Sequence, residues 1–264
     1  MAIAAPPAAS EAASEAAIDD TYAAFRDGHL IRVAGPDAPL PAVAQLVHDS
    51  FRALVLDPRF SCLGARSAVG RGRYRNGFYD QLGTTEASDA LARDLRRFLR
   101  EQETWGPDFS TFVASFAGPT VLTELAFEQH LWTQLRQLHG LDRASAHTWD
   151  PSVSSDPAQG TFAFSFAGRA FFIVGLHAAS SRWARRFAWP TLVFNTHEQF
   201  RRLRANGHFG RMQQIIRARE QALQGSLNPN LSEFGVRSEA RQYSGRAVDD
   251  DWRCPFPNEP VREP

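Results

Sequence analysis

The sequence predicts an α+β domain in which a mainly antiparallel sheet is flanked by helices. Segments with apolar residues at helical spacing and segments with alternating apolar residues are intermixed, without the regular strand–helix–strand rhythm of a doubly wound sheet. No internal repeat is found, and 43% hydrophobic residues in a chain of 264 are ample for one buried core. The sequence carries no glycine-rich dinucleotide-binding motif and no P-loop.

Residues 1–20 are predicted to be a disordered leader, and residues 21–264 a single domain. The segment from Met1 to Ala17 is almost entirely Ala, Pro, Ser and Glu. Such a segment buries too little apolar surface to offset the entropy lost on ordering. We assign it no function.

Four helices are predicted from apolar residues at helical spacing. The first spans residues 41–57, the second follows Ser88 as its N-cap, the third ends at Gly140, and the last long helix ends at Gly225. Their apolar faces are, in chain order, Val43, Val47, Phe51 and Leu54; Leu91, Leu95, Phe98 and Leu99; Phe127, Leu131, Leu135 and Leu138; and Met212, Ile215, Ile216 and Leu223.

Three segments are predicted to contain strands. Residues 111–116 alternate between apolar and other side chains and stop before Gly118-Pro119. Residues 161–176 are predicted to form a hairpin that turns at Ala167-Gly168, with a central, buried second strand. Residues 191–194 form a further short strand, whereas Cys62 and residues 142–160 are expected in loops.

Charge and cysteine usage exclude several classes of protein. The 29 basic residues, all arginine, balance 29 acidic residues, so the long-range field favours neither nucleic acid nor an anionic membrane. No run approaches the roughly 18 apolar residues of a membrane helix. Two cysteines are too few for a disulfide framework, and no secretory leader precedes them. We therefore expect a protein of the reducing cytoplasm.

The densest group of chemically capable residues lies in residues 175–186. A buried strand is predicted to end at His177, and Ser181 or the serine before it can cap a following helix. The arginines of that helix then share one face at i, i+3 and i+4: Arg182, Arg185 and Arg186. Such a face beside a helix N-terminus suits carboxylates or phosphates. The alternative is a solvated basic face beside a hydrogen-bonded core histidine.

A second strand end carries Asn195 and His197 into another predicted helix. His177 and His197 could both point into one pocket, where each could ligate a metal or haem iron or act as a general base. His197 could equally cap its helix or pack in the core.

Two further candidates lie outside these strand ends. Cys62 and Cys254 are nearly two hundred residues apart, which rules out a zinc-ribbon spacing. Cys62, followed by small residues, could ligate haem iron as a thiolate or could serve as a small apolar side chain. Glu239 could pair with a cationic substrate group or with its neighbours Arg237 and Arg241.

At these residues the sequence resembles the YqcI/YcgG family. It is most similar to the branch with haem-dependent guanidino N-hydroxylases of guanitoxin biosynthesis and the L-arginine hydroxylase of D-cycloserine biosynthesis. The resemblance covers nearly everything after the leader. Two positions depart from the pattern, because Ala178 and Thr196 stand where proline is expected. The segments that carry it are 62–65, 171–186, 192–195, 223–226 with Asn228-Pro229, 238–246 and 252–256.

The resemblance implies haem b, dioxygen and an external electron donor, used to hydroxylate a guanidino nitrogen of L-arginine or a relative in natural-product biosynthesis. It makes His177 the leading axial ligand, with Cys62 and His197 as alternatives. The arginines expected to neutralise the haem propionates are Arg182, Arg185 and Arg186, and Ser181 is expected to bind the cofactor as well. Glu239 is expected to hold the guanidinium in a site lined by Tyr243 and Asn195.

Two other functions stay open at this point. A haem-binding or haem-sensing protein without turnover would share the cofactor site but need no substrate carboxylate. A non-haem metal site could instead be built from His177 and His197. The expected partners are a small guanidino substrate and a redox protein, and a homodimer is left open.

Overall fold

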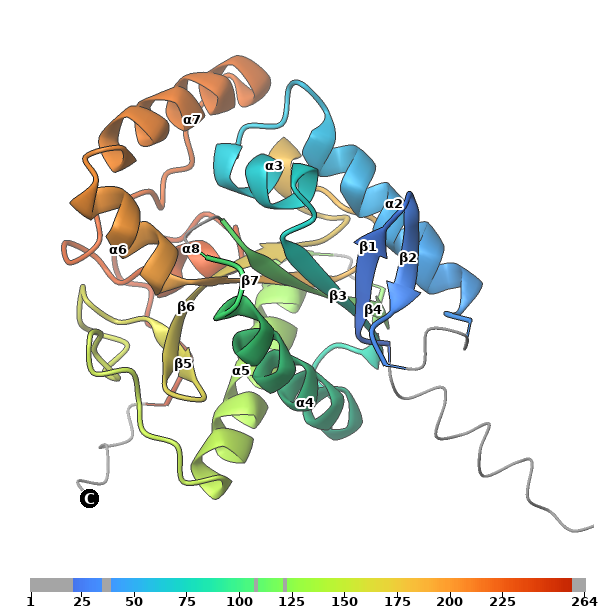
Figure 1. Ribbon diagram of the computed structural model, residues 1–264. Coiled ribbons are helices and arrows are strands. Elements are labelled where there is room, and N and C mark those ends of the chain that lie inside the picture. Colours follow the sequence, from blue (N-terminus) through green and yellow to red (C-terminus); the bar gives the residue numbers. More distant parts are fainter. Residues whose placement is uncertain (1–20, 35–38, 107–108, 121–122, 258–264) are drawn as a thin grey trace, which may run out of the picture.

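The computed structural model describes residues 21–34, 39–106, 109–120 and 123–257. The predicted disordered leader lies outside these residues. The described residues form one seven-stranded sheet with helices on both faces (Figure 1). The strands are β1 (Ala23–Arg26), β2 (His29–Arg32), β3 (Tyr74–Gln81), β4 (Thr111–Gly118), β5 (Phe164–Phe166), β6 (Arg169–Leu176) and β7 (Thr191–Thr196). The helices are α2 (Ala42–Leu56), α3 (Leu63–Gly70), α4 (Thr85–Gln102), α5 (Glu124–Ala144), the short 3-10 helix η1 (Trp183–Arg185), α6 (His197–Ala205), α7 (Phe209–Gln224) and α8 (Ala240–Tyr243).

The sheet is mainly antiparallel, as the sequence predicts. Its strand order is β2-β1-β3-β4-β7-β6-β5, and every neighbouring pair is antiparallel except β3 and β4. The parallel pair is joined through α4, because a parallel connection must cross over from one end of the sheet to the other. The fold class is therefore confirmed.

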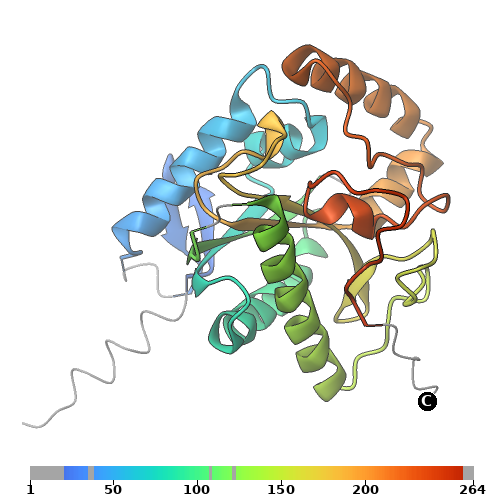
Figure 2. The same cartoon turned by 180° about the vertical axis from the view of Figure 1, so that it is seen from behind.

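Alternation along the central strands divides the apolar residues between two cores. Phe112 and Phe194 face a core built on α4 and α5, whereas Val113 and Val193 face a core built on α2 and α3. Successive side chains of a strand point to opposite faces, so each strand serves both cores. Figures 1 and 2 show α2 and α3 above the sheet and α4 and α5 below it.

Most predicted elements are present. Helix α2 matches the first predicted helix, β5 and β6 form the predicted hairpin, and β7 extends the predicted short strand by two residues. Gly225 ends α7 with a φ of 76°, the left-handed conformation that glycine adopts without a side-chain penalty. Where the described residues form helices, none is long and apolar enough to cross a membrane.

Several local predictions are wrong. Helix α5 continues through Gly140 to Ala144, and the N-cap of α4 is Thr84, whose hydroxyl accepts from the Ala87 N–H. The Ser88 hydroxyl is used elsewhere, in hydrogen bonds with the Thr84 carbonyl and with Gln137. The segment after Cys62 is a helix, α3, and the predicted arginine-bearing helix is only the three-residue η1.

Candidate functional site

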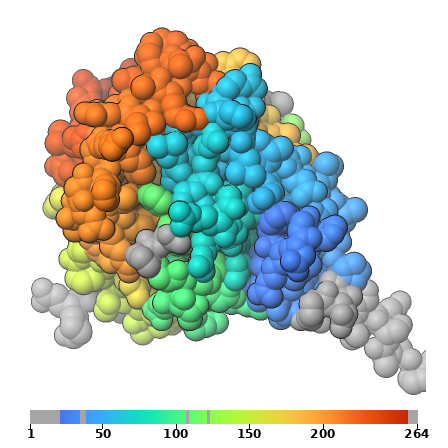
Figure 3. Space-filling model, turned by 45° about the horizontal axis from the view of Figure 1, so that its top comes forward, coloured from blue at the N-terminus to red at the C-terminus, as the bar shows by residue number. Residues whose placement is uncertain are grey.

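A cavity of about 330 Å³ lies on the α3 side of the sheet. Its floor is formed by Phe172 and Val174 of β6 and by Val193 and Asn195 of β7. Helices α3, α6 and α7 and residues 228–242 form its walls. In Figure 3 the surface is hollowed between the orange α6–α7 region and the cyan α3 region. A volume of this size is that of a small-molecule site.

Helix α7 covers the cavity without a core of its own. None of its residues is buried, although Phe209, Met212 and Ile216 face the cavity. Its attachments are polar: Glu220 pairs with Arg182 at 2.5 Å, and Gln224 bonds the backbone of residues 181 and 183. An amphipathic helix normally buries its apolar face against the protein. Here that face is turned towards a cavity instead.

A buried hydrogen-bonded network stands at one end of the cavity. His197 Nε2 lies 2.9 Å from Glu239 Oε1, and the Tyr243 hydroxyl donates to the same oxygen at 2.7 Å. Burial, followed by the charge of Glu239, holds the pKa of Tyr243 well above its usual range, so the hydroxyl keeps its proton. His197 and Glu239 line the cavity, whereas Tyr243 does not and acts through Glu239.

Two acceptor oxygens of this end remain available. Both hydrogen bonds that the Glu239 carboxylate makes in the described structure end on Oε1, which leaves Oε2 for a ligand. Asn195 uses its Nδ2 to donate to the carbonyls of Phe172 and Val193. Its Oδ1 makes no hydrogen bond with any residue that the structure describes.

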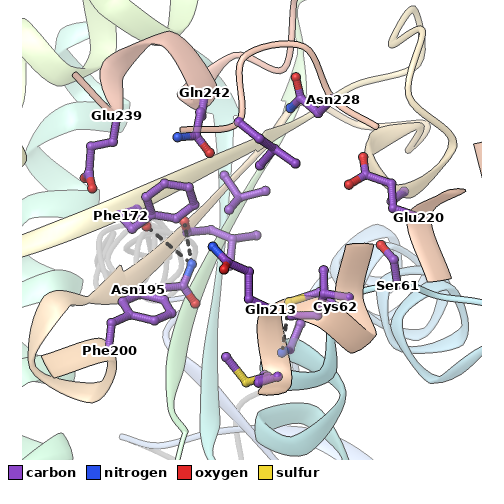
Figure 4. A pocket seen from close by; sticks show the side chains of 18 of the residues that line it. Ser61, Cys62, Phe172, Asn195, Phe200, Gln213, Glu220, Asn228, Glu239 and Gln242 are labelled. Atoms are coloured by element: carbon purple, nitrogen blue, oxygen red, sulfur yellow. Dashed lines mark hydrogen bonds between the residues drawn. The ribbon is translucent and has the colours of Figure 1, made fainter. Parts of the chain in front are cut away.

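Cys62 lies across the cavity from Glu239 and Gln242, beside Ser61 (Figure 4). It is the N-cap of α3, and its Sγ accepts from the Ala65 N–H at 3.5 Å. Burial raises the pKa of the thiol, while backbone N–H groups and the charge of Arg185 oppose that effect. Coordination to a metal deprotonates such a thiol, and the same donors then stabilise the thiolate.

The three predicted anion-binding arginines do not share one face. The reason is that η1 ends after three residues, so the i, i+3, i+4 relation of a helix is never established. Arg182 and Arg185 line the cavity, but Arg186 is exposed and lies over the Trp183 ring. Ser181 is also exposed and bonds Glu124 through its N–H and hydroxyl.

Arg185 differs from Arg182 in having no carboxylate partner. Arg182 is neutralised by Glu220, whereas Arg185 donates to the carbonyls of Gly175 and Tyr243. Burial lowers the pKa of Arg185 to about 10, so it stays charged at neutral pH. No carboxylate among the described residues forms an ion pair with it. A half-buried cation with no carboxylate in direct contact is a suitable place for an anionic ligand group.

His177 is buried on the opposite face of the sheet from the cavity. Its ring stacks on Phe127 of α5 with the centroids 4.2 Å apart, and neither ring nitrogen has a hydrogen-bond partner among the described residues. Burial is the main cause that lowers its pKa to about 4. His177 is therefore a neutral core histidine, and it does not line the cavity in which an iron ligand was expected.

The structure does not bring His177 and His197 together. Strands β6 and β7 are adjacent and antiparallel, so the carboxyl end of one lies beside the amino end of the other. His197 follows Thr196, which pairs with Phe171, six residues before His177. At about 3.3 Å per residue, these positions are roughly 20 Å apart along β6. Nowhere in the described ranges do three His, Cys, Asp or Glu residues form a metal site, so a non-haem site from these histidines gains no support.

The sequence pattern does not reveal that helix α7 is the lid of the cavity, that is, the element that covers it. The pattern predicts an apolar helix face that contains Met212 and Ile216, and it gives Glu220 no role. Periodicity shows which side of a helix is apolar but not whether protein or ligand covers it. The unusually polar surroundings of that stripe, with arginines on both sides, were the available signal.

Comparisons with known proteins bear on the family alone. The model of the YqcI/YcgG family matches residues 51–257, well over half of the chain and all of the cavity. Neither the curated proteins nor the solved structures gave a match.

Proposed function

The chain belongs to the YqcI/YcgG family, and on that premise we propose that it is a haem-dependent monooxygenase that hydroxylates a nitrogen of a guanidino compound. One observation carries the proposal: an apolar floor on β6 and β7 and an apolar lid on α7 enclose a cavity instead of a packed core. A large, flat apolar cofactor would supply the missing contacts. Bound haem b, with dioxygen and an external electron donor, would supply oxidising chemistry that side chains lack.

The residues that line the cavity fit a haem. Cys62 can provide a thiolate ligand whose sulfur accepts backbone N–H bonds at a helix N-terminus, which are interactions that tune thiolate-ligated iron. Arg185, which has no carboxylate partner, can hold a propionate. His177 does not line this cavity and stacks on Phe127 instead, so the proposal does not use it as the iron ligand.

The opposite end of the cavity suits a guanidinium group. A guanidinium has only donors, and Glu239 Oε2 and Asn195 Oδ1 are two acceptors without partners among the described residues. Phe172 and Phe200 pack edge to face with their centroids 6.2 Å apart, and their rings, which line the cavity, can contact the planar cation. These residues would bind and orient the substrate and keep water from its nitrogens.

Substitution of Glu239 by Gln tests this assignment. The amide keeps the size of the side chain but removes the charge that attracts the guanidinium, and a charged hydrogen bond contributes roughly 1.5–3 kcal/mol. We expect the dissociation constant of L-arginine, measured from its shift of the haem absorption, to rise at least tenfold while the haem content is unchanged.

Glu233→Gln is the matched control, since Glu233 lines the same cavity but is more than half exposed and pairs with Arg217. An unchanged L-arginine affinity in Glu239→Gln would contradict the substrate assignment. Bound haem with a normal L-arginine shift but no hydroxylated product, given a competent electron donor, would favour a haem-sensing protein.

A further inference from the structure

The network at the substrate end of the cavity contains a histidine that the binding roles above do not use. His197 lines the cavity with only 5% of its surface exposed. Its Nε2 faces the carboxylate of Glu239, and its Nδ1 makes no hydrogen bond with a described residue. A carboxylate fixes the proton of a neutral histidine on the nitrogen that it contacts. Nδ1 is then the basic nitrogen, and it is left without a protein partner.

The side chains around His197 keep it in this orientation. Phe200 and Phe234 contact the imidazole edge-on, with centroids 6.4 and 5.3 Å away. Tyr243 donates to the same carboxylate oxygen that His197 contacts, so Glu239 is held from two sides. Two cations of the lining, Arg204 and Arg237, are exposed, and Arg237 pairs with Asp250. The arrangement of base and orienting carboxylate is that of a general base.

A general base can assist hydroxylation of a guanidino nitrogen by removing a proton from it. The unperturbed pKa of a guanidinium group lies far above neutral pH, so the substrate arrives protonated, with its nitrogen electrons delocalised and the group positively charged. We propose that His197 Nδ1 accepts a proton from the guanidinium, a role that rests on the proposed function. One N–H bond breaks, its electron pair stays on the nitrogen, and the proton forms the Nδ1–H bond of an imidazolium. Glu239 stabilises that imidazolium through Nε2.

The two carboxylate oxygens of Glu239 then have different roles. Oε1 orients His197, while Oε2 is proposed to hold the substrate cation, so one carboxylate would position both the proton donor and the proton acceptor. Tyr243 is a positioning residue, because it reaches the substrate only through Glu239. The electron-rich neutral guanidine is the form that an electrophilic oxidant attacks.

His197→Gln in the haem-loaded protein separates proton transfer from binding. General base catalysis contributes typically about a hundredfold or more. We expect kcat for L-arginine hydroxylation to fall by at least this factor, while the L-arginine dissociation constant changes by less than about threefold. The control is His208→Gln, which removes an exposed histidine outside the cavity. In a second variant, His197→Ala, added imidazole should restore part of kcat.

A readout independent of activity comes from nitrogen chemical shifts of the histidine rings in the haem-free chain. Wild-type His197 should carry its neutral-form proton on Nε2, and Tyr243→Phe should leave that tautomer less strongly preferred. Unchanged kcat in His197→Gln, or a proton fixed on Nδ1 in the wild type, would overturn the proposal while leaving the hydroxylase function intact. A wild-type protein that makes no hydroxylated product, although haem and an electron donor are supplied, would contradict both the base role of His197 and the hydroxylase function.

Discussion

Replacing His177 by Phe should change how the stability of the protein depends on pH. The imidazole is fully buried against Phe127 without a hydrogen-bond partner among the described residues, so its charged form is disfavoured in the folded state. Burial lowers its pKa from 6.5 to about 4. The unfolded chain therefore binds a proton between these two pH values that the folded chain does not. Folded stability is full above pH 6.5 and is lost as the pH falls towards 4.

The size of the effect follows from the two pKa values. A difference of about 2.5 pKa units, at about 1.36 kcal/mol for each unit, gives roughly 3 kcal/mol of stability lost between pH 7 and pH 4. His177→Phe removes the titrating group, so the difference in unfolding free energy between variant and wild type should change by that amount over this range. His48 and His139, whose pKa values burial also lowers, are common to both proteins and cancel.

Urea unfolding of the wild type and His177→Phe at half-unit steps from pH 7 to pH 4 measures this difference. If the larger ring fits poorly, the variant loses the same free energy at every pH, and the pH-dependent part remains readable. A difference that stays constant across the range would refute the interpretation of His177 as a neutral, unpartnered core histidine.

Two further substitutions test the packing of the site. Gly175→Ala should destabilise the fold by about 1–3 kcal/mol, since a Cβ there would lie 2.5 Å from Phe127 Cε1 and 2.9 Å from the Tyr243 carbonyl oxygen. Thermal unfolding measures this loss of stability. An unchanged stability would mean that β6 and α8 are not in close contact. Ile216→Ala on α7 should cost the haem-free chain under about 1 kcal/mol, because no protein core covers it, whereas Leu131→Ala in the α5 core should cost about 2–5 kcal/mol. Faster loss of haem from Ile216→Ala is expected, and equal stability losses in the two variants would contradict the role of α7 as a lid.

The fold was predictable wherever the residue pattern is local. Alternation in 111–116 and 161–176 and helical spacing in 209–224 are properties of single elements, and each gave the element found. A further local signal is Asp27-Gly28, which joins β1 and β2 with both residues at positive φ, because Asp-Gly is a strong hairpin turn signal. The hairpin at the start of the domain was therefore within reach of the sequence.

Prediction of the site depends on tertiary contacts, which the local residue pattern does not contain. Cys62, Asn195, His197 and Glu239 were singled out and do line one cavity. The sequence favours His177 because it ends a strand, but strand direction decides at which end of the sheet that residue lies, and β6 runs opposite to β7. Tertiary contacts such as these are not visible in the spacing of residues along the chain.

The prediction that three arginines share one helix face is wrong for a different physical reason. Their spacing has meaning only if the segment is helical, and residues 177–190 instead form bends around η1. Arg182 is held by Glu220, a residue 38 positions away, and Arg186 turns to solvent over Trp183. Only Arg185 keeps the expected capacity for an anion.

The absorption spectrum of the purified protein, produced with ample haem and recorded oxidised, reduced and with carbon monoxide, tests the central claim most directly. The account predicts a Soret band in the wild type with the features of thiolate ligation in the reduced carbon monoxide complex. Those features should disappear in Cys62→Ser and persist in His177→Phe. A wild type with no Soret band, or a Cys62→Ser spectrum identical to that of the wild type, would contradict the account.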